Sequence, residues 1–327
     1  MARDASLQST ASTNDARYAR RLAAGFGALV ALTFALITLG ALVRANQAGL
    51  ACPDWPLCFG EFIPRMDLRI GFEWTHRVVA GGVGIAFVLL CGFSLQRSAT
   101  RAACGALMGI AALLLAAQVV LGALTVWKLL AAWTVTSHLL TGNAFAVSLL
   151  WIALALGECA RGAAAPAAVG PGARIAVSAA AALLILQMLL GGLVASRYAG
   201  LACPDFPTCR DGIWLPSFAG AVGLQLAHRL VALALVAGLA TTAFLCRGEP
   251  PRLRRSASLA LGLGLLQLGV GAANVLLALP PEVTGLHSAL AAALVLSVSV
   301  ALRESWRAPL RGGAAASALP EGASPGL

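Results

Sequence analysis

The sequence predicts an all-α integral membrane protein whose eight transmembrane helices form two tandem four-helix bundles. Three observations lead to this fold class. Apolar residues make up 59% of the 327 residues and charged residues only 11%, with a mean hydropathy of +0.85, whereas about a quarter of a soluble domain is charged. Eight apolar segments are long enough to cross a bilayer, which takes roughly 20 residues per helix. The second half of the chain also repeats motifs of the first.

The predicted spans are apolar runs bounded by charged residues, glycine and proline. In order, they cover residues 22–43, 74–95, 103–126, 132–156, 174–195, 219–246, 256–279 and 283–302. The first span is too long for the apolar core of a signal peptide and lacks a convincing cleavage site, so we expect it to stay in the mature protein.

The spans divide the chain into five regions. They are an N-terminal tail (1–21), a first bundle (22–156), a linker rich in Ala, Gly and Pro (157–173), a second bundle (174–303) and a low-complexity C-terminal tail (304–327) that we expect to be disordered.

Arginines in the short flanks predict the orientation. If the N-terminus is cytoplasmic, most of the 23 Lys and Arg residues face the cytoplasm, as the positive-inside rule requires. Both termini are then cytoplasmic, and both cysteine-containing loops lie on the outer side. The net charge of +10 reflects this topology and attraction to anionic membrane lipid, and no patch in it indicates nucleic-acid binding.

An internal duplication covers nearly the whole chain. AGLACPDWPLC at 48–58 returns as AGLACPDFPTC at 199–209, and His76-Arg77 returns as His228-Arg229. Further along, Gln118, Gly122 and Val126 match Gln267, Gly271 and Val275, and His138 matches His287. Each unit holds an even number of helices, so both enter the membrane in the same direction. We therefore expect a pseudo-twofold axis along the membrane normal.

The chain contains four histidines, His76, His138, His228 and His287. Each lies near the start of an even-numbered span, so all four share one depth near the outer face. A single histidine there would often make an interhelical hydrogen bond, but four equivalent positions fit that role poorly. Two neutral imidazoles can bind a haem iron from both faces. We pair His76 with His138 and His228 with His287, which gives one haem per bundle.

Arg77 and Arg229 follow the first histidine of each pair. A cation at the outer end of a span is costly unless it is paired or reaches the surface. Haem propionates would supply carboxylates at this place, so we predict propionate contacts for both arginines. The alternative is an arginine whose long side chain reaches the membrane surface.

Glu73 precedes His76 by three residues and shares its helix face, whereas the second half has Gln225 at the equivalent position. A carboxylate in a dehydrated site is a usable general base. The first bundle is therefore the candidate for chemistry, and the second for a permanently held cofactor. Alternatively, Glu73 is a residue at the lip of the site that hydrogen-bonds Arg77 or the loop.

The eight cysteines form two groups. Cys52/Cys58 and Cys203/Cys209 have C-x5-C spacing in outer loops, where oxidising conditions favour two loop-internal disulfides. Because each closed loop is short and the stabilisation small, a redox role also stays open. The other four, Cys91, Cys104, Cys159 and Cys246, are interpreted as small apolar fillers.

Taken together, GLACPDWPLC, EWTHR at 73–77, the Q-x3-G-x3-V run before His138 and their second-half copies resemble the haem A synthase family. The resemblance covers residues 25–303. It implies an oxidoreductase of the bacterial cytoplasmic (inner) membrane that oxidises the C8 methyl group of haem O to a formyl group, giving haem A for terminal oxidases. It places substrate haem O between His76 and His138 and the cofactor haem b between His228 and His287.

The same resemblance matches Glu73 to the family's functionally important glutamate and Cys52/Cys58 to its outer cysteine pair. The second pair, Cys203/Cys209, is absent in some members. A haem O synthase, cytochrome oxidase assembly factors and a second copy of the chain are candidate partners. Two other functions stay open, a di-haem b electron-transfer protein oxidising quinol or thiols, and a transporter built on duplicated bundles.

Overall fold

The computed structural model describes residues 2–162 and 167–307, with the side chains of residues 2–12 excepted. These ranges are all-α, with eight long helices and one short 3₁₀ turn, η1, at Cys246–Gly248. The helices are α1 (Ala2–Ala45), α2 (Leu68–Leu95), α3 (Ser98–Trp127), α4 (Ala132–Arg161), α5 (Pro171–Ser196), α6 (Gly220–Leu245), α7 (Pro251–Leu276) and α8 (Pro281–Trp306).

All eight helices are long and apolar enough to cross a membrane, which confirms the predicted number of spans. The largest difference is at the N-terminus, where α1 begins at Ala2 although residues 1–21 were predicted as a tail. The extension packs on the end of α2 and the turn after it. Tyr18 donates to the carbonyl oxygen of Phe93 at 2.8 Å, and Asp15 pairs with Arg97. Most of the predicted C-terminal tail, 308–327, lies outside the described residues.

Local sequence signals fix several helix ends. Pro171, Pro251 and Pro281 each occupy the first turn of a helix, where the missing N–H of proline costs nothing. Asp67 caps α2 by accepting a hydrogen bond from the backbone N–H of Ile70 at 2.8 Å. The predicted linker is shorter than expected, because α4 continues to Arg161 and α5 starts at Pro171.

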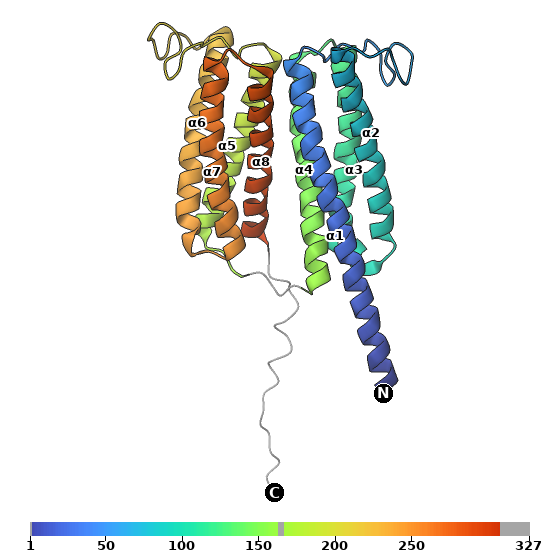
Figure 1. Cartoon of the computed structure of the whole chain (residues 1–327). Coiled ribbons are helices and arrows are strands. Elements are labelled where there is room, and N and C mark those ends of the chain that lie inside the picture. The colour runs from blue at the N-terminus through green and yellow to red at the C-terminus, as the bar shows by residue number, and fades with distance from the viewer. Residues whose placement is uncertain (1, 163–166, 308–327) are drawn as a thin grey trace.

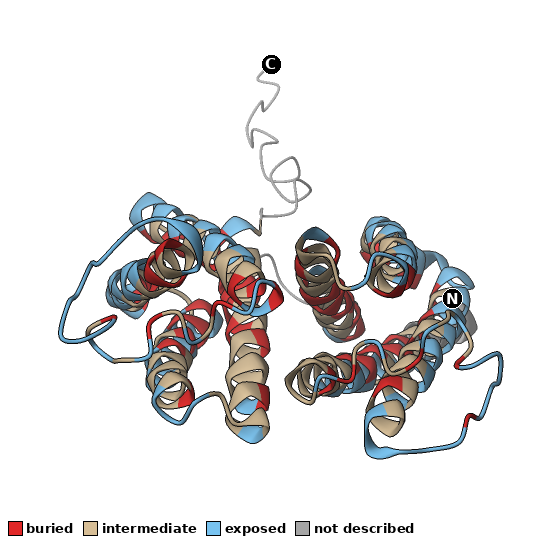
Figure 2. Ribbon diagram, turned by 90° about the horizontal axis from the view of Figure 1, so that it is seen from above, coloured by how far each residue is buried: buried red, intermediate tan, exposed pale blue. Residues whose placement is uncertain are grey.

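The helices pack as two groups of four, which stand side by side in Figure 1. In the first group, α1 and α3 each pack against both α2 and α4, so α2 and α4 stand diagonally opposite. In the second group, α6 and α8 occupy the diagonal. Figure 2 shows buried residues gathered toward the inside of each group and exposed ones outside. Because many exposed side chains are large and apolar, the outer surface suits lipid.

A seam formed by α1 and α4 on one side and α5 and α8 on the other joins the two groups. Gly285 lets Leu42 approach closely, since a Cβ at Gly285 would stand 2.7 Å from Leu42 Cδ2. At the end that carries the cysteine loops, Arg44 donates to the carbonyl oxygen of Ala195 at 2.7 Å. At the opposite end, Arg303 and Glu158 form an ion pair of 2.7 Å. Contacts at both ends of the seam therefore hold the two groups together.

Candidate functional site

Each of the four histidines rests against a glycine of the preceding helix. A Cβ added to that glycine would stand 3.0 to 3.4 Å from Cε1 of the imidazole, which is closer than ordinary van der Waals contact. The four contacts join Gly40 of α1 to His76 of α2, Gly122 of α3 to His138 of α4, Gly191 of α5 to His228 of α6, and Gly271 of α7 to His287 of α8. The absence of a side chain at these glycines sets where each ring can lie.

The histidines form two pairs, each within one group of helices. His76 and His138 come from the diagonal helices α2 and α4 and lie within electrostatic range of each other. His228 and His287 have the same relationship across α6 and α8. Two imidazoles from opposite corners of a bundle are suited to approach a flat ligand from its two faces.

Buried polar atoms without a hydrogen-bond partner gather around these pairs. They include Nδ1 of His76, His138 and His287 and Oε1 of Gln118, Gln187 and Gln267. Buried polar atoms in folded proteins are nearly always satisfied, so such a cluster indicates a place for a bound group. Together with the glycine contacts, these orphaned atoms fit a haem held between paired imidazoles.

Glutamines on the odd-numbered helices contact the histidines of the second group. Gln187 Nε2 lies 3.1 Å from His228 Nδ1, and Gln267 Nε2 lies 3.2 Å from His287 Nε2. Each glutamine precedes its contact glycine by four residues and shares its helix face. These contacts hold both imidazole rings in place. No site role was predicted for these glutamines, although their recurring Q-x3-G spacing was a usable signal.

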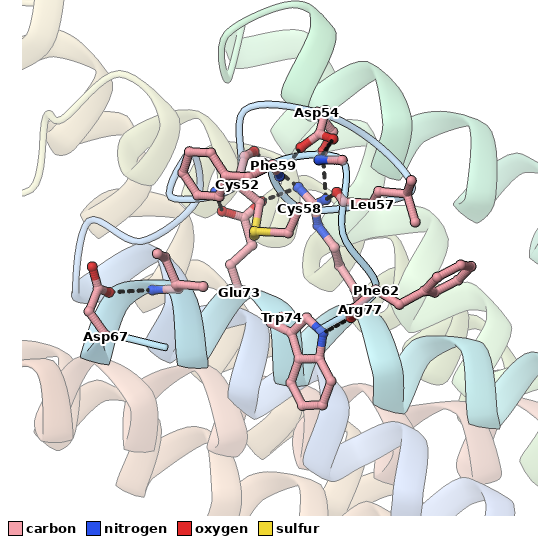
Figure 3. The surroundings of a disulfide bond; sticks show 12 residues. Cys52, Asp54, Leu57, Cys58, Phe59, Phe62, Asp67, Glu73, Trp74 and Arg77 are labelled. Atoms are coloured by element: carbon pink, nitrogen blue, oxygen red, sulfur yellow. Dashed lines mark hydrogen bonds and ion pairs between the residues drawn. A yellow bond between two sulfur atoms is a disulfide. The ribbon is translucent and has the colours of Figure 1, made fainter. Parts of the chain in front are cut away.

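Glu73 and Arg77, which flank His76 on α2, contact the first cysteine loop, as Figure 3 shows. Glu73 is 5% exposed. Its Oε2 accepts a hydrogen bond from the backbone N–H of Cys52 at 2.9 Å, and its Oε1 pairs with Arg77 at 2.5 Å. Arg77 also donates to the carbonyl oxygens of Asp54 and Leu57, both at 2.6 Å. These are the contacts expected of the alternative role for Glu73, a residue at the lip of the site that hydrogen-bonds Arg77 and the loop.

The second half repeats the arginine contacts but not the carboxylate. Arg229 donates to the carbonyl oxygens of Cys203 at 2.6 Å and Thr208 at 2.9 Å. Gln225 is 4% exposed and donates to the carbonyl oxygen of Gly200 at 3.2 Å, while its Oε1 has no partner. Both arginines thus fasten a cysteine loop to the helix below it. Their contact with haem propionates stays a prediction.

Disulfides close both loops, between Cys52 and Cys58 and between Cys203 and Cys209. This confirms the predicted pairing, and the four remaining cysteines are free, as expected.

Asp54 shapes the first cysteine loop. Its carboxylate accepts backbone N–H groups from Phe59 and Gly60, both at 2.7 Å. The bond from Gly60 is the main cause that lowers the pKa of Asp54 below its usual value.

Eight helices able to cross a membrane, with two pairs of histidines on diagonal helices, define a polytopic membrane protein whose helix bundles fit haem. The family profile described as COX15-CtaA, cytochrome oxidase assembly protein, matches residues 25–71 and 67–299. The chain belongs to this family.

Three curated relatives, each named heme A synthase, are similar to this chain. The protein of Shewanella oneidensis is 30% identical over 307 residues, covering 81% of this chain and 91% of its own length. The protein of Symbiobacterium thermophilum is 30% identical over 242 residues, covering 71% and 78%. That of Bacillus cereus strain 03BB102 is 29% identical over 197 residues, covering 59% and 63%.

Proposed function

We propose that the protein is a haem A synthase, an oxidoreductase that converts the C8 methyl group of haem O into the formyl group of haem A for terminal oxidases. Family membership and the printed names of the relatives support this function. The observation in this chain that supports it most is the arrangement of four histidines as two diagonal pairs. An iron porphyrin accepts two axial ligands on opposite faces, which such a pair can supply.

The two pairs have different roles in this proposal. His76 and His138 hold haem O as substrate, and His228 and His287 hold a resident haem b, which supplies one-electron redox chemistry when bound. Glutamines contact both histidines of the second pair, whereas in the first half only Gln118 precedes its contact glycine by four residues and Leu36 takes that position before Gly40. A site with firmly oriented ligands suits a permanent cofactor, and a less constrained one suits a substrate that must leave.

Glu73 is the proposed proton acceptor. Oxidation of a methyl group releases protons as well as electrons, and Glu73 lies one helical turn from His76. Its oxygens accept hydrogen bonds from Cys52 and Arg77, so they are oriented by fixed donors. Gln225 has no basic oxygen at the equivalent place, which assigns this step to the first half.

The proposed organisation follows the duplication. Residues 22–156 and 174–303 form two bundles related by a pseudo-twofold axis along the membrane normal, with both termini cytoplasmic. Disulfides in both loops support placing the loops on the oxidising side of a bacterial inner membrane. Haem O synthase and oxidase assembly factors are the partners this function requires for substrate supply and product use.

Acid extraction of haem from the purified protein tests the function. Cells that make haem O should yield protein containing haem B together with haem O, its hydroxylated form or haem A, identified by chromatography and mass. A His287→Ala variant should lose haem B, and a His76→Ala variant should keep haem B and lose the others. Haem B alone in every preparation would instead support the electron-transfer protein, and no haem at all would refute the proposed histidine roles.

A further inference from the structure

A groove opens on the seam between the two groups of helices, at the end remote from the cysteine loops. It has a volume of about 410 Å³ and is lined by Trp151 of α4, by Leu302, Arg303 and Trp306 of α8, and by Arg307 just after α8. None of the four histidines lines this groove. Its wall is apolar and aromatic, and its mouth is basic.

The charges at the mouth are layered. Three guanidinium groups, from Arg252, Arg303 and Arg307, share the carboxylates of Glu158 and Glu304. Both carboxylates are 11% exposed, whereas Arg307 is 23% and Arg252 50% exposed. Because three cations share two anions, and Arg307 and Arg252 are more exposed than the anions, the outer face of the mouth is positively charged.

Two buried hydrogen-bond donors beside the groove have no partner among residues 2–162 and 167–307. One is Nε1 of Trp151 in the wall, and the other is Nε of Arg174, whose guanidinium lies 5.8 Å from the ring centroid of Trp306. Both atoms can only donate. These two donors therefore each need an acceptor, which an oxygen-rich anionic group would supply.

The groove also extends along the helices. Trp151 precedes the end of α4 at Arg161 by about 15 Å of helix, at 1.5 Å per residue. Trp306, by contrast, lies at the last residue of α8 and is 59% exposed, as is common for tryptophan at a membrane interface. A ligand that fills the groove needs a charged head at the helix ends and an apolar tail within the span.

We propose that this groove binds one anionic phospholipid, with its phosphate at Arg307 and Arg303, an ester oxygen accepting from Nε1 of Trp151, and an acyl chain along Leu302 and Trp306. Basic pockets between transmembrane helices on the cytoplasmic side are suited to such headgroups. A soluble phosphate or an acidic peptide would use the arginines but would leave the apolar wall uncovered. The bound lipid would bridge α4 and α8, so it would also fasten the seam.

Native mass spectrometry of the delipidated full-length protein tests the site. Phosphatidylglycerol should bind with a stoichiometry of one, and phosphatidylcholine of the same chain length should bind much more weakly. Arg307→Gln and Trp151→Phe should each weaken phosphatidylglycerol binding by about tenfold, the effect of losing one charge-assisted or buried hydrogen bond. Trp151→Phe keeps an aromatic ring and leaves the ion pairs intact, so weaker lipid binding by this variant cannot be attributed to misfolding.

Arg210→Gln is the matched control, because it removes one positive charge at the opposite end of the molecule. It should leave lipid binding unchanged. Equal weakening by Arg210→Gln and Arg307→Gln would refute the site in favour of diffuse attraction to the basic protein. Binding of glycerol 3-phosphate or an acidic peptide as tightly as phosphatidylglycerol would also refute it, as would equal binding of phosphatidylcholine.

Discussion

Replacing Gly271 with alanine should release haem b from the second half of the protein. The new Cβ would stand 3.0 Å from Cε1 of His287, so the ring must move by a few tenths of an ångström. An imidazole pushed off its rotamer costs about 0.5 to 1.5 kcal/mol, and losing the contact with Gln267 costs a similar amount. The sum, about 1 to 3 kcal/mol, weakens haem binding by roughly five- to 150-fold.

Gly269→Ala is the matched control, because it adds a Cβ to the same helix where nothing lies within 4 Å. The assay is the ratio of haem B to protein after purification, together with the electron paramagnetic resonance spectrum of the bis-imidazole ferric haem. Gly271→Ala should lower the ratio and shift the spectrum, while Gly269→Ala changes neither. Equal haem content and identical spectra in both variants would refute a role of the glycine contact in orienting His287.

Three further perturbations separate the parts of the first half. Glu73→Gln should retain haem B but accumulate haem O, with turnover reduced about 10²- to 10⁴-fold, while Gln225→Glu keeps turnover, as measured by haem chromatography. Serine at both Cys52 and Cys58 should lower the unfolding free energy by about 2 kcal/mol, measured by thermal denaturation against the wild type, and an unchanged midpoint would contradict this. The pKa of Asp54 is lowered, so the stability that its carboxylate gives the loop is present above the usual aspartate pKa and is lost as the pH falls through the lowered value. Asp54→Asn should therefore speed amide exchange in the loop at neutral pH. Below the lowered pKa the variant and the wild type should exchange at the same rate.

The sequence was sufficient to predict the eight long apolar helices, while the pairing of the histidines as haem ligands stays a prediction. In a bilayer, an apolar run of this length satisfies its backbone hydrogen bonds only as a helix. Four histidines at one depth leave few possible pairings. The helix ends were less predictable, because polar residues prolong helices beyond the apolar run. Tyr18 and Asp15 stabilise the extra turns of α1 through contacts with residues about 80 positions away, which no local pattern contains.

The partners of the charged residues were the least predictable part of the site. Arg77 lies near both a possible ligand and the loop, and only the fold brings the carbonyl oxygens of Asp54 and Leu57 within reach. Glu158 fell in the predicted linker, yet it lies on α4 and binds Arg303 of α8. In both cases a long charged side chain can reach several neighbours, and the sequence does not show which of them lie close to it.

The contacts at the two ends of the seam have a consequence for producing the protein as two separate polypeptides. Arg44 reaches Ala195 at one end and Glu158 reaches Arg303 at the other, so the association of the halves does not depend on the peptide bond that joins them. We expect two separately translated polypeptides, cut between α4 and α5, to assemble in the membrane into a complex that copurifies on a single affinity tag. Such a split protein would allow each half to be labelled or exchanged independently.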